Sequence, residues 1–152
     1  MSDLPILTGH LAGFEDTIAA TREKREELYK WFHQHPELSM EEYATSQRIE
    51  EVLKSIGFTV TAVGKTGKVG VLENGEGPVV AFRADFDALP IAEDTGLEYS
   101  ADPALNKMHA CGHDGHTAML LGAAEYLSAT RDFAGSVVFI FQPAEENVAG
   151  GK

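Results

Sequence analysis

Residues 136–146, Ser-Val-Val-Phe-Ile-Phe-Gln-Pro-Ala-Glu-Glu, join a mostly apolar run to two adjacent glutamates. The run at 136–141 carries apolar side chains on both faces, so we expect a central strand that is covered on two sides. Glu145 and Glu146 would repel each other at the end of a buried strand, and a bound cation is the simplest compensation. One carboxylate could bind the cation while the other takes a proton from an activated water molecule. The alternative is a helix N-terminus, where the helix dipole favours acidic residues.

The segments around this strand predict an α/β fold, in which helices pack on a mixed, mainly parallel β-sheet. Helices are expected from about His10 to His33, from a Ser39/Glu42 capping box to Gly57, and over 117–128. Strands are expected at 58–63, 69–73 and 79–84, the last two as a hairpin closed by Asn74-Gly75. In such folds the ligand site lies at the carboxyl ends of the strands.

The composition indicates one globular domain and excludes several classes of partner. The chain has 152 residues, 43% of them hydrophobic, which is enough for a real core. The formal net charge of −12 argues against nucleic acids and anionic membrane surfaces as partners. We see no run long enough to span a bilayer and no signal-peptide pattern. Cys111 is the single cysteine, so no disulfide forms within the chain, and we expect a cytoplasmic protein.

Residues 109–116 hold three histidines, one cysteine and one aspartate within eight positions. His109, Cys111 and His113 alternate, so their side chains could converge if the loop is extended. Thiolate and imidazole are good ligands for zinc and related divalent ions. A polar loop with surface histidines is the alternative for any one of these residues. The density of the whole cluster favours a metal site.

Two further segments carry polar residues that could support this site. Asp85 and Asp87 follow the strand predicted at 79–84 and could orient ligand histidines, or they could form a capped turn before Pro90. His33 and His35 form a His-x-His pair, but the pair closes a helix before a proline. We therefore expect capping and packing roles for these two histidines.

Four segments together resemble the dinuclear metal-dependent amidohydrolases and metallopeptidases. This family includes N-acyl-amino-acid aminoacylases, hippurate hydrolases and auxin-conjugate hydrolases. The segments are His-Pro-Glu-Leu (35–38), Arg-Ala-Asp-Phe-Asp-Ala-Leu-Pro-Ile (83–91), Met-His-Ala-Cys-Gly-His-Asp-Gly-His-Thr-Ala (108–118) and Phe-Gln-Pro-Ala-Glu-Glu (141–146). They occur in the family's order and at its spacing. The resemblance implies a catalytic domain of the zinc-peptidase type.

The resemblance implies a role for each matching residue. Cys111, His113 and Glu146 match metal ligands. Glu145 matches the general base that activates the attacking water, and Asp87 matches the aspartate that orients or polarises the metal site. Supporting roles fall to the other motif residues, His109, Asp114 and His116. The implied cofactor is a divalent metal, two ions per complete site, with zinc or manganese first and cobalt or nickel also compatible.

The implied reaction is hydrolysis of the amide bond of an N-acyl amino acid or a small peptide-like substrate. Family members are much longer and carry a lid or dimerisation domain and two further metal-binding histidines. We therefore expect residues 1–152 to form the N-terminal part of the catalytic domain, inactive or weakly active alone. Such a chain would associate as a homo-oligomer or with a C-terminal portion. The alternatives are a non-catalytic association fragment with a partial metal site, and a thiol-dependent hydrolase using Cys111 with His113 or His109.

Overall fold

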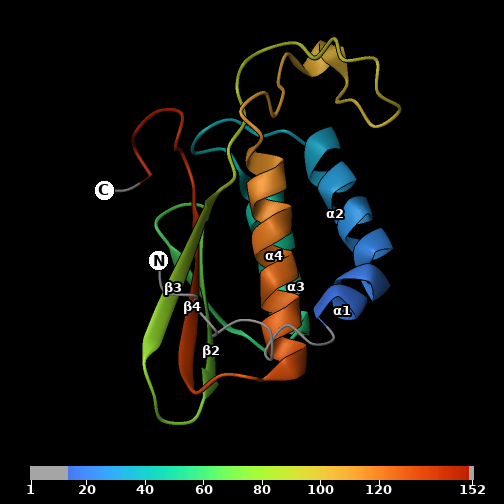
Figure 1. The fold of residues 1–152 in the computed structure, drawn as a ribbon. Helices are drawn as coiled ribbons and strands as arrows, with labels where there is room; N and C mark the ends of the chain where they lie inside the picture. Colours follow the sequence, from blue (N-terminus) through green and yellow to red (C-terminus); the bar gives the residue numbers. More distant parts are fainter. Residues whose placement is uncertain (1–13, 151–152) are drawn as a thin grey trace, which may run out of the picture.

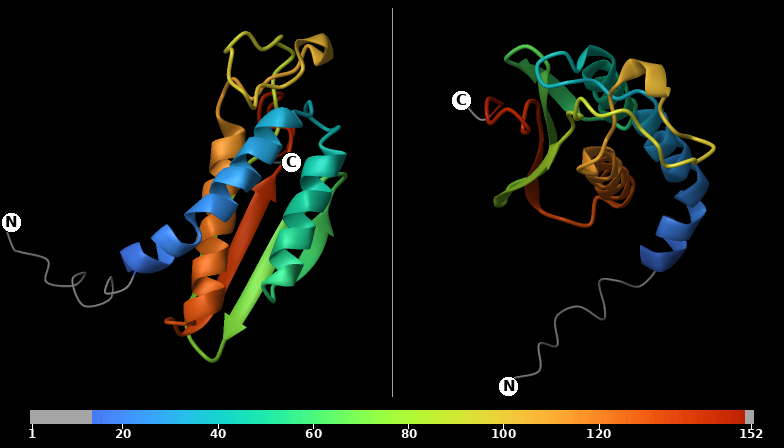
Figure 2. Two further views of the ribbon diagram at one scale, coloured as in Figure 1. Left: turned by 90° about the vertical axis from the view of Figure 1, so that its right-hand side faces the viewer. Right: turned by 90° about the horizontal axis from the view of Figure 1, so that it is seen from above.

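A computed structural model describes residues 14–150, which form a sheet with helices packed against one of its faces (Figures 1 and 2). The elements in chain order are α1 (Phe14–Ala20), α2 (Arg22–Gln34), α3 (Tyr43–Ser55), β1 (Thr59–Val63), β2 (Gly67–Asn74), β3 (Val79–Asp85), a 3-10 turn (Pro103–Leu105), α4 (His113–Thr130) and β4 (Gly135–Gln142). The long segment between β3 and α4 has little regular structure and lies at one end of the molecule (Figure 1). Within residues 14–150, no helix combines the length and apolar composition that crossing a bilayer requires.

The sheet has the strand order β1-β2-β4-β3. The prediction of an α/β fold with a mixed sheet is confirmed. The expectation of a mainly parallel sheet is wrong for the described residues, because β1 with β2 and β2 with β4 pair antiparallel and β3 with β4 pairs parallel. The antiparallel pairs arise because β1 and β2 are joined by a short turn and β4 then runs back along β2.

The predicted hairpin of 69–73 with 79–84 is also wrong, because β4 lies between these two strands. Asn74 of β2 pairs with Gly135, and Val79 of β3 pairs with Ser136. The start of β4 therefore lies between β2 and β3, next to the loop that connects these two strands. The Ser136 amide donates to the Pro78 carbonyl at 3.0 Å. Gly135 has φ +92°, and a Cβ there would lie 2.1 Å from the Pro78 oxygen, so this entry requires glycine.

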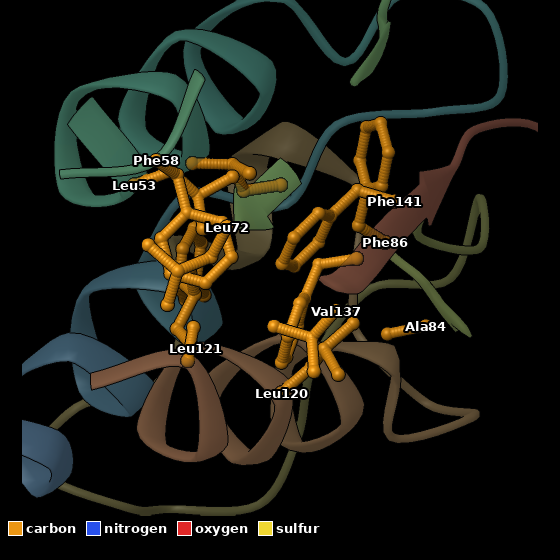
Figure 3. Packing of buried hydrophobic residues seen from close by; sticks show 13 residues of the cluster. Leu53, Phe58, Leu72, Ala84, Phe86, Leu120, Leu121, Val137 and Phe141 are labelled. Carbon is orange, nitrogen blue, oxygen red and sulfur yellow. The ribbon is translucent and has the colours of Figure 1, made fainter. Parts of the chain in front are cut away.

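The strand β4 is buried on one face only. Val137 and Phe141 point into the core (Figure 3), and Phe139 belongs to the same buried cluster. Ile140, on the opposite face, is 36% exposed, and Val79 of the neighbouring β3, on the same face as Ile140, is 68% exposed. The expectation of cover on two sides is therefore wrong for the described residues, because the described helices pack on a single face. Each large side chain buried in that core contributes roughly 1.5–3 kcal/mol relative to exposure.

The helix expected from His10 to His33 is two helices, and residues 10–13 lie outside the described part. The helix is interrupted at Thr21, whose hydroxyl and amide both donate to the Thr17 carbonyl, at 3.0 and 3.3 Å, and a threonine hydroxyl bonded in this way bends a helix. Arg25, which interrupts the apolar stripe of α2, lies over α4: a Cβ on Gly122 would come 2.7 Å from its Cδ.

The prediction of a capping box formed by Ser39 and Glu42 is wrong. Glu42 makes no side-chain cap to α3, and the Ser39 hydroxyl donates to Asp87 at 2.6 Å. The N-terminus of α3 is instead bound by Glu37, whose carboxylate accepts the amides of Ala44 and Thr45 at 3.0 and 2.8 Å. At the other end Gly57 adopts φ +87°, in agreement with the predicted stop.

Candidate metal centre

The carboxyl ends of the parallel strands β3 and β4 lie side by side, with Asp85 in register with Gln142. The chain leaves these ends through Asp87 on one side and Glu145-Glu146 on the other. The helix α4 begins at His113, four residues earlier than predicted, and its N-terminus lies at the same end of the sheet (Figure 1). This arrangement brings together the candidate residues of three separate motifs.

The three predicted metal ligands converge. Ligand atoms of Cys111, His113 and Glu146 all lie within 4.8 Å of one another. His113 is buried and Glu146 is half-buried, whereas Cys111 is exposed. Oε1 of Glu146 is buried and has no hydrogen-bond partner among residues 14–150. A buried carboxylate oxygen without a partner is costly, so the site fits a bound cation.

The orientation of His113 is set by Asp87. Nδ1 of the imidazole lies 2.9 Å from the Asp87 carbonyl and 3.2 Å from its Oδ1, so this nitrogen is the donor. Nε2 is left as a lone-pair ligand and lies 3.7 Å from Oε2 of Glu145 and 3.9 Å from Oε1 of Glu146. Burial acts to lower the pKa of His113, but the bond to Asp87 and the nearby carboxylates outweigh it and raise the pKa.

Asp87 connects two of the candidate ligands. Its second oxygen, Oδ2, accepts the Ser39 hydroxyl at 2.6 Å and the Glu146 amide at 3.0 Å. Burial opposes ionisation, yet these donors and His113 lower the pKa of Asp87 to about 2. The buried aspartate is therefore ionised at neutral pH and orients both sides of the site.

The thiol of Cys111 is not activated as a nucleophile. Partial desolvation of the thiol, the charge and hydrogen bond of Glu146 and the charge of Glu145 raise the pKa of Cys111 above the ordinary value. Reactive cysteines have a lowered pKa and an electropositive environment, which argues against a thiol-dependent hydrolase. A bound cation would reverse this balance by favouring the thiolate.

Asp85 and His116 form a hydrogen-bonded pair next to His113. Nδ1 of His116 lies 2.7 Å from Oδ1 of Asp85, and Arg83 contacts the other oxygen at 2.9 Å. Asp85, His113 and His116 also form a ligand-like group. That group would use the same Nε2 of His113 as Cys111 and Glu146 do, and Arg83 already compensates the aspartate. The supporting role predicted for His116 and the orienting role predicted for Asp85 stay predictions.

The remaining motif histidines have separate environments. His109 is 5% exposed, and neither ring nitrogen has a hydrogen-bond partner among residues 14–150. His33 is buried between two carboxylates, Asp114 at 2.6 Å and Glu93 at 3.0 Å. His35 stacks on Trp31, with ring centroids 4.3 Å apart. The expected capping and packing roles agree with the contacts of His35, whose Nδ1 also lies 2.6 Å from the Trp31 carbonyl at the end of α2, whereas His33 instead joins two buried carboxylates.

Sequence reasoning missed two buried acids near the site, Glu42 and Glu93. Both residues are nearly inaccessible, with exposed fractions of 0% and 3%. No local pattern marks their burial, because Glu93 binds His33 across 60 positions and Glu42 binds Ala144 across 102 positions. An acidic residue becomes informative in this way only once its burial is known.

The chain matches known metallohydrolases in sequence and in fold. Residues 81–152 match the model of peptidase family M20/M25/M40. The IAA-amino acid hydrolase ILR1-like 2 of Arabidopsis thaliana is 47% identical over 138 residues, covering 85% of this chain and 31% of the relative. Hippurate hydrolase of Campylobacter jejuni is 46% identical over 129 residues, with 84% and 33% covered.

Among solved structures, the YXEP protein of Bacillus subtilis, described as a dinuclear metal-binding peptidase of the M20 family, superposes with a TM-score of 0.80. It is 41% identical and matches over 87% of this chain and 38% of that protein. The resemblance inferred from the four motifs is thereby confirmed. The chain spans about a third of the length of the curated relatives that it matches.

Proposed function

We propose that this chain, whose residues 81–152 match the model of peptidase family M20/M25/M40, supplies metal ligands and the general base for hydrolysis of the amide bond of N-acyl amino acids. The observation that carries the proposal is the convergence of Cys111, His113 and Glu146 within 4.8 Å, beside the partly exposed carboxylate of Glu145. Residues 1–152 are, in this proposal, the N-terminal part of a catalytic domain that the remainder of a longer enzyme completes.

Cys111, His113 and Glu146 would hold a divalent cation, one of two in the complete site. Zinc suits the sulfur, nitrogen and oxygen donors, manganese is the second choice, and cobalt or nickel also fit them. Such a cation would polarise the amide carbonyl and make the attacking water more acidic.

Glu145 is placed to move the proton. Its Oε2 lies 3.7 Å from Nε2 of His113, and its side chain is 42% exposed, so it reaches both the ligand cluster and the solvent. We assign it removal of a proton from the attacking water and delivery of that proton to the leaving amine. Asp87 keeps His113 in the tautomer that presents Nε2 to the site.

The substrate class follows from the relatives, which are named as hydrolases of IAA-amino acids and hippurate. An N-acyl amino acid or a small peptide-like amide is the proposed substrate. We also propose a cytoplasmic location, because a free thiol at Cys111 is suited to a reducing compartment.

A non-catalytic association fragment is the second candidate function. It is favoured by apolar side chains that stay exposed on β3 and β4. Val80 and Phe82, at the edge of the sheet, are 47% and 40% exposed, and Val79 and Ile140, on the uncovered face, are 68% and 36% exposed. A homo-oligomer, or a complex with the remainder of a longer enzyme, would bury this face.

The decisive experiment measures zinc and manganese binding to the purified chain and to Cys111→Ala, followed by turnover of N-acetyl and N-benzoyl amino acids. We expect bound metal in the wild type, and an affinity at least about tenfold lower in Cys111→Ala. Glu145→Gln should retain the metal and abolish any turnover. Equal metal binding by wild type and Cys111→Ala would reject the ligand assignment. A discrete oligomer that binds metal without turnover would favour the second candidate.

A further inference from the structure

Ala144, the residue before the proposed base, has a backbone conformation that alanine seldom adopts. Its φ is +54°, in the left-handed region, and its side chain is fully buried. An L-residue with a Cβ is strained in this region, and such strain persists only where the surroundings impose it. Ala144 lies between the end of β4 and the turn that begins with Glu145 and Glu146.

The amide of Ala144 is held by a carboxylate from a distant part of the chain. Oε1 of Glu42 accepts this N–H at 2.9 Å, across 102 positions of sequence. Glu42 has an exposed fraction of 0%, and its other oxygen, Oε2, accepts the Thr66 hydroxyl at 2.7 Å. Thr66 is itself tied to α3, because its carbonyl accepts the Ser46 hydroxyl at 2.5 Å. The carboxylate is thus fixed in position from two sides.

The carbonyl groups of Ala144 and Glu145 are also hydrogen-bonded, to amides that follow in the same turn. The Ala144 carbonyl accepts the amides of Ala149 and Gly150 at 3.1 and 3.2 Å. Beyond it, the Glu145 carbonyl accepts the Val148 amide at 2.8 Å. The Glu146 amide is bound by Asp87. The direction in which the two glutamates leave β4 therefore depends on the conformation of Ala144, which Glu42 holds at its amide.

We propose that Glu42 is a positioning residue, which holds Ala144 in the left-handed conformation and thereby aims Glu145 and Glu146 at the metal site. The roles of Glu145 and Glu146 rest on the proposed function, whereas the hydrogen bond by which Glu42 holds the Ala144 amide does not depend on it. Glu42 contacts no reacting group, so it acts only through the turn at 144–146.

Five variants of the 152-residue chain, together with one control, separate this role from a general contribution to stability. Glu42→Leu removes the acceptor, Glu42→Gln keeps an acceptor oxygen, and Glu42→Asp keeps the charge on a shorter side chain. Ala144→Gly, alone and combined with Glu42→Leu, removes the cost of the left-handed conformation. The exposed neighbour gives the matched control, Glu41→Leu.

The first measurement is amide hydrogen exchange of the metal-free chain, followed residue by residue. We expect Glu42→Leu and Glu42→Asp to accelerate exchange at Ala144 and Glu146 by about tenfold or more, while amides in β2 and β4 stay within about threefold. Glu42→Gln and Glu41→Leu should resemble the wild type. Ala144→Gly should recover part of the protection at Glu146 when combined with Glu42→Leu.

The second measurement is zinc affinity under conditions where every variant is folded. Glu42→Leu should bind zinc about 10–100-fold more weakly, as for other residues that orient ligands, and Glu42→Gln should bind within about threefold of the wild type. Uniform acceleration across the sheet, or a glutamine variant no better than leucine, would overturn the proposal. A wild type that binds no zinc would reject the metal site alone, since exchange at Ala144 and Glu146 still decides the role of Glu42. If Glu42→Leu does not fold, Glu42→Asp decides it.

Discussion

Replacing Asp87 with asparagine would remove one charge from the centre of the site and leave its shape almost unchanged. The two carboxylate oxygens of Asp87 face three donors: the His113 imidazole, the Ser39 hydroxyl and the Glu146 amide. Asparagine has a single acceptor oxygen. Either its NH₂ group faces the Glu146 amide, which then loses its partner, or it faces His113, whose Nδ1 keeps only the backbone carbonyl of residue 87 as an acceptor. In the second case the imidazole loses one of the two acceptors that hold it in the tautomer needed for the site.

The magnitude follows from the lowered pKa of Asp87. Burial alone would raise this pKa, but the donors bring it from 3.8 to about 2, which corresponds to about 2 kcal/mol of folding stability at neutral pH. Because the folded-state pKa is the lower one, this stability is complete above about pH 4 and is lost as the pH falls through about 2. Metal affinity should fall about 10–100-fold, as is typical when a residue that orients a ligand is changed.

Urea denaturation of the metal-free chain at pH 7 and at pH 2.5 measures the first effect, and a zinc titration at pH 7 measures the second. The free energy of unfolding of Asp87→Asn should lie about 2 kcal/mol below that of the wild type at pH 7, and the gap should shrink at the acidic pH. Asp94→Asn, at an exposed position, is the control with the same change of charge. A gap that is the same at both pH values, or zinc affinity equal to that of the wild type, would refute the reasoning.

Two further predictions concern the core of the fold. The pKa of His33 is lowered by burial but raised further by the two carboxylates that it bridges, so its net shift is upward. Stability from this cluster is therefore complete below about pH 6.5 and lost as the pH rises through the folded-state pKa. His33→Gln should lose more stability relative to the wild type at pH 6 than at pH 9 by thermal denaturation, and an equal loss would contradict the assignment. Gly135→Ala should cost more than about 2 kcal/mol in urea denaturation, since its Cβ would collide with the Pro78 carbonyl. Gly64→Ala, with φ +60° but no atom within 4 Å of the new Cβ, should cost about 1–2 kcal/mol, and similar losses for both glycines would exclude the steric explanation.

The sequence alone determined the features that depend on neighbouring residues. The apolar run at 136–141 forms a strand, and Gly57 ends a helix, because both signals act over a few positions. The candidate ligands Cys111 and His113 are two residues apart, so their proximity needs no knowledge of the fold. The position of Glu146 beside them followed from a general rule, that strand ends in an α/β sheet lie together.

The tertiary structure decided which distant partners each element has. The Asn74-Gly75 turn favours a hairpin locally, but β4 enters between its arms because the pairing buries Val137 and Phe139 against the helices. The same holds for Glu42, an acidic residue in a polar stretch, which becomes a buried acceptor for an amide 102 positions away. Local patterns report conformation and tendency to burial, whereas the choice among distant partners depends on the packing free energy of the whole chain. Only the folded chain therefore reveals what holds Glu145 and Glu146 in place.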